Sequence, residues 1–154
     1  MNRLTAGLLA PMLALAATPA LADPGRGVPG PEAMAVMQAM GLDAELLEDS
    51  VGDPMIRFTT SGLTAYLNFY DCREARCGSL QLEVGLDLED GTTFQVANAY
   101  NARYRYGRMV LDHEMDPFLQ YDFEVLHTQH GAQIRSQVEI FNQLLGDFTR
   151  AVDF

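Results

Sequence analysis

The residues best suited to bind a metal ion lie in one acidic turn. Asp112, Glu114 and Asp116 alternate along the stretch LDHEMDP, with His113 between the first two. Carboxylate oxygens are the ligands that a hard cation such as Ca²⁺ prefers, but the stretch lacks the central glycine and the distal glutamate of a calcium loop. An Asp-Pro step is also typical of an ordinary turn. We therefore expect a solvated acidic turn, with a metal site as the alternative.

A second group with ligand chemistry precedes the last predicted helix. His127 and His130 are three residues apart in HTQH, and Glu124 lies three residues before them. Two imidazoles and a carboxylate suit Zn²⁺ or Cu²⁺. The segment joins a predicted strand to a predicted helix, however, and exposed histidines at the start of a helix are the commoner case. We expect no metal and no cofactor, and we keep these residues as the alternative.

Catalytic motifs do not occur in the sequence. It contains no G-x-S-x-G, no H-E-x-x-H, no phosphate-binding loop and no dinucleotide fingerprint. No serine or cysteine has a recognisable base and orienting group nearby, although the members of a triad need not be close in sequence. We therefore expect a protein that is not an enzyme.

The chain has two cysteines, Cys72 and Cys77. Strand alternation assigns Cys72 to the same outer face as Tyr70, and Cys77 to that of Gln81. A wide hairpin turn between them would bring the two strand ends within reach of a disulfide. A metal site needs further ligands, and redox pairs usually have the spacing C-x-x-C at a helix start. In an exported protein the pair therefore predicts a structural disulfide.

The N-terminus has the three parts of an export signal. Arg3 precedes an apolar run over residues 4–17, and the small-residue motif ALA follows at 20–22. The run is shorter than the ~20 residues of a membrane span, and Pro11 interrupts it. We predict a signal peptide over residues 1–22, no stable membrane anchor after cleavage, and a periplasmic or secreted location.

The remainder of the chain predicts a linker and one acidic domain. Residues 23–30 are rich in proline and glycine, which predicts a flexible linker. Residues 31–154 have the length of one domain. The whole sequence has 10 basic and 21 acidic residues, giving a net charge of −11. Such a surface repels phosphates, and no basic stripe compensates, so we expect no nucleic-acid partner.

Hydrophobic periodicity predicts an α+β domain with three helices on one face of an antiparallel sheet of about five strands. Helices are predicted over 31–40 and 94–104, and a closing helix carries apolar residues from Ile134 to Val152. Strands are predicted over 55–60, 63–70, 80–88, 108–113 and 118–126, with a further short strand over 44–48.

Alternation along the central hairpin separates two faces. Leu67, Phe69, Leu82 and Val84 point to the side that the helices cover, and Tyr66, Tyr70, Gln81 and Glu83 point outward. Exposed tyrosines offer a large contact area and a hydroxyl group, which suits protein or peptide contacts. We take these four outward residues as the candidate binding face; the alternative is that the rings only cover the sheet.

Polar residues of the second helix admit two interpretations. Asn98 and Asn101 lie three residues apart and therefore on one side of this helix. They either bind a ligand or hold the backbone of the following turn, and we favour the second interpretation. Arg103, Arg105 and Arg108 lie near the C-terminal end of this helix, where the helix dipole explains them without an anionic ligand.

An ordered set of short motifs extends along most of the chain. In order they are GDP at 52–54, FYDC at 69–72, CGSL at 77–80, NAYN at 98–101, RYG at 105–107 and LDHEMDP at 111–117. Together they resemble the YbjN domain family, with Tyr100 where that family has tryptophan. The resemblance implies a curved antiparallel sheet with helices packed on it, like type III secretion chaperones, and a role in bacterial sensory transduction. It implies no catalytic residues; we assign Asn98, Asn101, Arg105 and Gly107 a structural role.

We therefore expect an exported binding or chaperone-like regulatory module of the bacterial envelope, acting through protein or peptide contacts, with a homodimer as one form of such contact. The alternative is a metal-responsive or hydrolytic envelope protein that uses Asp112, Glu114, Asp116 and the histidines.

Export and the disulfide are tested together by intact mass. The protein recovered from the envelope of an expressing bacterium, without reductant, should have the mass of residues 23–154 less two hydrogens. An uncleaved chain would contradict the signal peptide, and a chain with two free thiols would contradict the disulfide.

Overall fold

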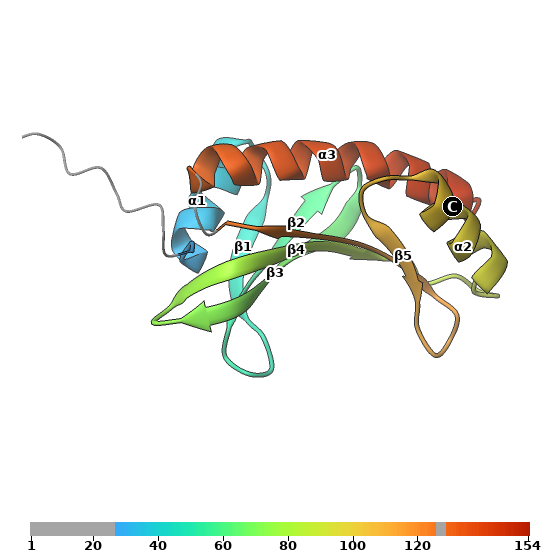
Figure 1. Ribbon diagram of the computed structural model, residues 1–154, viewed down its shortest axis with the longest axis horizontal. Helices are drawn as coiled ribbons and strands as arrows, with labels where there is room; N and C mark the ends of the chain where they lie inside the picture. Colours follow the sequence, from blue (N-terminus) through green and yellow to red (C-terminus); the bar gives the residue numbers. More distant parts are fainter. Residues whose placement is uncertain (1–26, 126–128) are drawn as a thin grey trace, which may run out of the picture.

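A computed structural model describes residues 27–125 and 129–154, and Figure 1 shows it. Within these ranges the chain forms three helices and one open antiparallel sheet of six strands. The elements are α1 (Gly30–Ala39), β1 (Ala44–Glu48), β2 (Pro54–Thr60), β3 (Leu63–Arg73), β4 (Arg76–Gly85), α2 (Phe94–Arg103), β5 (Arg108–Leu111), β6 (Pro117–Glu124) and α3 (His130–Ala151). The strand order is β1-β2-β3-β4-β6-β5. The predicted α+β class is confirmed, and the short strand over 44–48 completes the six.

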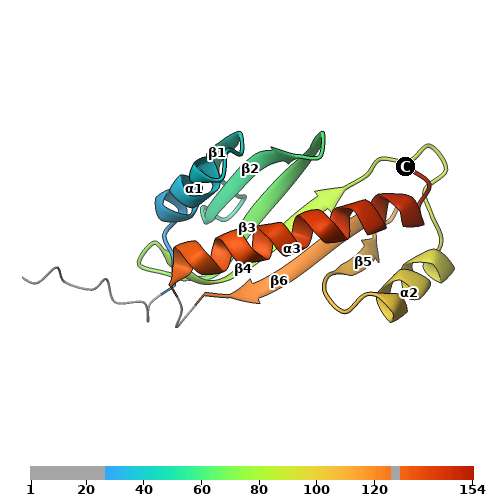
Figure 2. The ribbon, with the colours of Figure 1, turned by 90° about the horizontal axis from the view of Figure 1, so that it is seen from above.

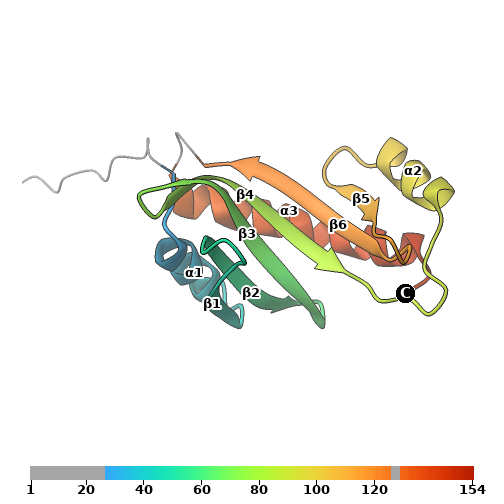
Figure 3. The same cartoon turned by 90° about the horizontal axis from the view of Figure 1, so that it is seen from below.

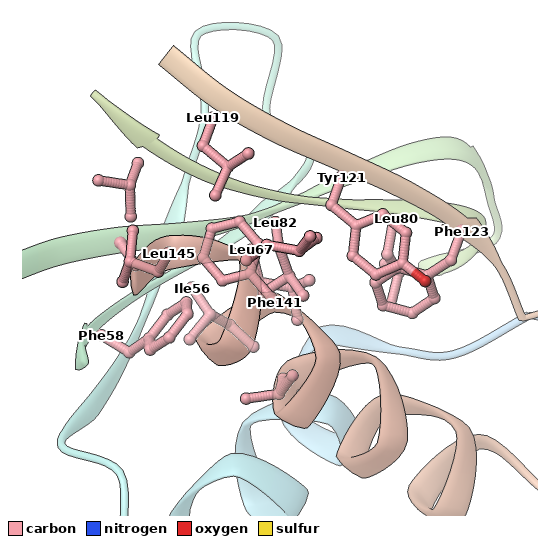
Figure 4. Packing of buried hydrophobic residues seen from close by; sticks show 14 of the residues in the cluster. Ile56, Phe58, Leu67, Leu80, Leu82, Leu119, Tyr121, Phe123, Phe141 and Leu145 are labelled. Carbon is pink, nitrogen blue, oxygen red and sulfur yellow. The ribbon is translucent and has the colours of Figure 1, made fainter. Parts of the chain in front are cut away.

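Helix α3 lies along one face of the sheet, which we call the inner face (Figure 2). Its apolar residues recur every three or four positions and are buried, as the sequence predicts: Ile134, Val138, Phe141, Leu145 and Phe148. They pack against the inward set of the strands, which includes Ile56, Phe58, Leu67, Leu80, Leu82 and Leu119 (Figure 4). The main core of the domain therefore lies between α3 and the inner face.

The two short helices pack at opposite ends of this layer. Helix α1 has Pro31 in its first turn and contacts α3, β1 and β2. Helix α2 is capped by Thr93, whose Oγ1 accepts a hydrogen bond from Val96 N at 3.2 Å, and it contacts β5 and α3. In residues 27–125 and 129–154, no helix is both long and apolar enough to cross a membrane.

The β3–β4 hairpin is longer and tighter than predicted. Cys72 and Cys77 are cross-strand partners within it and form a disulfide, so the predicted wide turn is wrong. The strands turn at Glu74 and Ala75, whose φ angles of 52° and 61° are typical of a type I′ turn. That turn matches the twist of the strands, but neither residue is one of the glycines or asparagines by which it is usually recognised.

We predicted that Cys77 lies on the exposed outer face, and that was wrong, because Cys77 is fully buried. Asp71 has a φ of 51°, which departs from extended backbone, but the cross-strand register continues through Cys72 and Cys77. Val28 also pairs with Cys77 through two backbone hydrogen bonds of 3.0 Å and is itself fully buried. Residues 27–30, which we assigned to a flexible linker, therefore belong to the domain. The predicted signal peptide lies outside the described residues.

The helix phase can be tested with two neighbouring substitutions. Phe141 has no exposed surface, so Phe141→Ala should lower the free energy of unfolding by about 3–5 kcal/mol. Gln143→Ala, at an exposed position of the same helix, should change it by less than about 0.5 kcal/mol. Equal shifts of the two urea midpoints would show that the assigned face of α3 is wrong.

Candidate functional site: the outer face of the sheet

The described helices leave the other face of the sheet uncovered, as Figure 3 shows. We call it the outer face. Cross-strand register aligns its residues in rows: Arg57, Tyr66, Glu83, Gln120 and Arg108 form one row, and Met55, Asn68, Gln81 and Asp122 form the next. Tyr70 lies two residues beyond Asn68 and therefore on the same side. The structure thus brings Tyr66, Tyr70, Gln81 and Glu83 to one face, as the sequence predicts.

A chain of side-chain hydrogen bonds crosses three strands of this face. Gln120 Nε2 donates to Glu83 Oε2 at 2.7 Å, and Gln120 Oε1 accepts from Arg108 Nη2 at 3.0 Å. Arg108 Nη1 lies 2.7 Å from Asp122 Oδ2, and Asp122 Oδ1 accepts from Gln81 Nε2 at 2.7 Å. We call these five residues the polar ladder. It restricts their rotamers, so the centre of the outer face is held in one arrangement.

The polar ladder corrects two sequence interpretations. Gln81 is only 6% exposed and its amide donates to Asp122, so it is not a free contact residue. Arg108 belongs to β5 and bonds Gln120 and Asp122, so the dipole of α2 does not account for it. Along β6, Gln120 and Asp122 alternate with the buried Leu119, Tyr121 and Phe123. The sequence did not indicate that β6 pairs with β4, and so these partners were missed.

The two tyrosines occupy different environments on the outer face. Tyr70 is 46% exposed. Its partial burial raises the pKa of its phenol, and the carboxylates of Glu83, Asp122 and Asp49 raise it further. Arg108 acts in the opposite direction. Carboxylates from the polar ladder and from the β1–β2 loop thus act on the phenol of Tyr70. Tyr66 is half-buried and lines a hollow of about 410 Å³ at the β1 side of the face.

Two acidic hairpin loops extend beyond the sheet on its outer side (Figure 1). In the β1–β2 loop, Asp49 Oδ1 accepts hydrogen bonds from Val51 N and Asp53 N, both at 2.9 Å. In the β5–β6 loop, Asp112 Oδ1 accepts from Glu114 N and Asp116 N at the same distances. Each loop has the sequence D-x-x-x-D-P. In each loop the backbone N–H of the first aspartate also donates a hydrogen bond to the backbone carbonyl of the second. The two hairpins are therefore built in the same way.

This shared construction explains the acidic cluster of the β5–β6 loop. The carboxylate oxygens of Asp112, Glu114 and Asp116 lie within 4.8 Å of one another. Val51 occupies the position in the β1–β2 loop that Glu114 occupies in the β5–β6 loop. The same hydrogen bonds form in the β1–β2 loop without a third carboxylate. Asp116 Oδ1 also accepts from Leu88 N at 2.9 Å, which ties the β4–α2 connection to the hairpin. Backbone hydrogen bonds thus account for the positions of both aspartates.

The predicted histidine group is not assembled in the described residues. His127 lies outside them. His130, the first residue of α3, is 7% exposed, and its Nδ1 lies 3.4 Å from Glu32 Oε1 of α1. We predicted an exposed histidine here, and that was wrong because α1 packs beside the start of α3. Glu124 is exposed at the end of β6, on the outer face.

The asparagine and arginine motifs have structural contacts. Asn101 Oδ1 accepts from Met109 N at 2.7 Å and its Nδ2 donates to Met109 O at 3.0 Å, so its amide holds the backbone of β5, as we favoured. Asn98 is exposed. Arg103 and Arg105 lie over the rings of Tyr104 and Tyr106, at 5.4 and 5.5 Å from the ring centroids.

Gly107 provides the turn between α2 and β5. Its φ of 72° favours glycine, and an added Cβ would lie 3.2 Å from a methyl group of each of Leu119 and Leu144. This position therefore has both a conformational and a packing reason to be glycine.

The structural role of the two loops can be tested by matched substitutions. Asp49→Ala and Asp112→Ala should each lower the free energy of unfolding by about 1–2 kcal/mol, because each removes the acceptor of two backbone N–H groups. Glu114→Gln should leave it nearly unchanged. Thermal denaturation with and without Ca²⁺, Mn²⁺ or Zn²⁺ provides the second readout. A marked stabilisation by one metal that Glu114→Gln abolishes would contradict this account.

Comparison with known proteins identifies the family. A search of the curated proteins and a search of the solved structures each gave no match. The secretion-chaperone likeness that the resemblance implies therefore stays a prediction. A family profile matches residues 34–154, which include every described strand. The family is YbjN, described as "putative bacterial sensory transduction regulator". The chain belongs to the YbjN family.

Proposed function

We propose that this protein is an exported regulatory module of the bacterial envelope that works without catalysis, through protein or peptide contacts on its outer face. The observation that carries the proposal is the uncovered face of the sheet, with Tyr66 and Tyr70 on β3 beside a fixed polar ladder. The family description, which names a regulator and no reaction, supports it.

The chemistry of the outer face suits a protein contact. Tyrosine combines a large apolar surface with a hydroxyl group and loses few rotamers on binding. The polar ladder on the neighbouring strands is already ordered, so less conformational entropy is lost when a partner binds. The hollow beside Tyr66 is lined by polar residues and by the Arg57–Glu45 ion pair, which suits a side chain that forms hydrogen bonds.

Two features support an envelope location. The N-terminal sequence has the pattern of a cleaved signal peptide. The Cys72–Cys77 disulfide is of the kind that persists in oxidising compartments such as the periplasm. The partner is a protein or peptide, and a second copy of the chain is one form that it can take.

The proposal is tested by removing the tyrosines. The Tyr66→Ser, Tyr70→Ser double variant should stay folded by circular dichroism and lose its co-purifying envelope partner, or its dimer in light scattering. Phe94→Ser is the matched control, because Phe94 is 68% exposed on α2, away from the outer face; it should keep both. Unchanged recovery and unchanged mass in the double variant would show that the working surface lies elsewhere. If the double variant unfolds, Tyr70→Ser alone, at a 46% exposed position, gives the same comparison.

A further inference from the structure

We propose that the outer face recognises a cationic peptide segment, one whose arginine or lysine side chains meet its carboxylates and tyrosine rings. This inference rests on the proposed function and adds the chemical class of the partner. It follows from how charge is distributed over the fold, which the net charge alone does not reveal.

The three helices carry balanced charge. Their acidic residues are Glu32, Glu139 and Asp147, and their arginines are Arg103, Arg135 and Arg150. The described helices that cover the inner face therefore have as many arginines as carboxylates. The excess negative charge of the chain must lie on the strands and loops.

The outer face carries part of that excess. Its strands contribute Glu45, Glu83, Asp122 and Glu124 against Arg57 and Arg108. Both of these arginines are already paired, Arg57 with Glu45 and Arg108 with Asp122. Glu83 and Glu124 have no ion pair with any residue that the structure describes. An incoming cation would therefore find, among the described residues, carboxylates without an ion pair on β4 and β6, of which Glu83 accepts only the hydrogen bond from Gln120.

The two hairpin loops increase the negative potential at both sides of this surface. They contribute Asp49 and Asp53 on one side and Asp112, Glu114 and Asp116 on the other. Both loops extend on the outer side of the sheet (Figure 1). A surface with an excess of one sign of charge attracts a partner of opposite sign and speeds its arrival.

Tyr70 lies within this negative region, where Glu83, Asp122 and Asp49 act on its phenol. The face of an aromatic ring also attracts ammonium and guanidinium groups, arginine more often than lysine. An arginine-bearing segment would thus find carboxylates and exposed aromatic surface on the same side of the sheet. A second copy of the chain would present the same carboxylates and be repelled, which disfavours a dimer through this face.

The test measures binding of two labelled peptides to the oxidised mature protein by fluorescence anisotropy. One peptide alternates arginine and alanine, and the other alternates glutamate and alanine. The arginine peptide should bind, with an affinity that falls as NaCl rises from about 50 to 300 mM, because salt screens exposed charges. The glutamate peptide should not bind.

Two variants of equal charge locate the site. Glu83→Gln with Glu124→Gln should weaken binding of the arginine peptide about three- to tenfold, as expected for the loss of two partly exposed charges. Glu139→Gln with Asp153→Asn removes the same charge from α3 and the C-terminus, and should change the affinity less than twofold. Glutamine at position 83 can still accept the hydrogen bond from Gln120; if the double variant unfolds, Glu124→Gln alone supplies the comparison.

Three results would overturn the inference. Equal weakening by both double variants would mean attraction to net charge and not to this face. Absence of arginine-peptide binding, while the tyrosine variant still loses its envelope partner, would leave the proposed function standing and exclude a cationic segment. A dimer that is lost in the tyrosine variant but not affected by salt would identify the occupant as a second copy.

Discussion

The packing of α3 against the inner face is the interaction on which the rest of the structure depends. Its buried stripe, with Phe141 and Phe148 among the fully buried residues, faces strands whose inward residues recur every second position. A helix of 22 residues can cover one face of an open sheet but not both. The described helices all contact the inner side or the β5 end, so the outer face is left uncovered, and its side chains bond one another across the strands.

The polar contacts of the outer face also hold the structure together. Arg108, Gln120 and Asp122 join β5, β6 and β4 through the polar ladder, and the first aspartate of each acidic loop holds its own backbone. Carboxylates needed for these contacts leave a negative surface beside two tyrosines. The shape and the charge of the candidate site therefore follow from how the sheet is stabilised without a second helical layer.

Much of this arrangement could be predicted from the sequence, because period-two and helical patterns report burial directly. The inward set on β3 and β4, the stripe of α3 and the outward placement of Tyr66 and Tyr70 all followed from such patterns. The pairing of β4 with β6 could not, since a strand pattern does not specify its neighbours, and the ladder partners of Gln81 were missed with it. The burial of Cys77 and His130 was missed for a related reason: both are covered by segments distant in sequence, Val28 and α1.

The central claim is that the outer face, and not the helical layer, is the working surface. The most direct measurement is the mapping of amide chemical shifts in the ¹⁵N-labelled mature protein during titration with the arginine peptide. Our account predicts changes that concentrate at Tyr66, Tyr70, Glu83 and Glu124 and extend into the two acidic loops. Changes confined to α3 and α2, or spread evenly over the acidic residues of the whole chain, would contradict it.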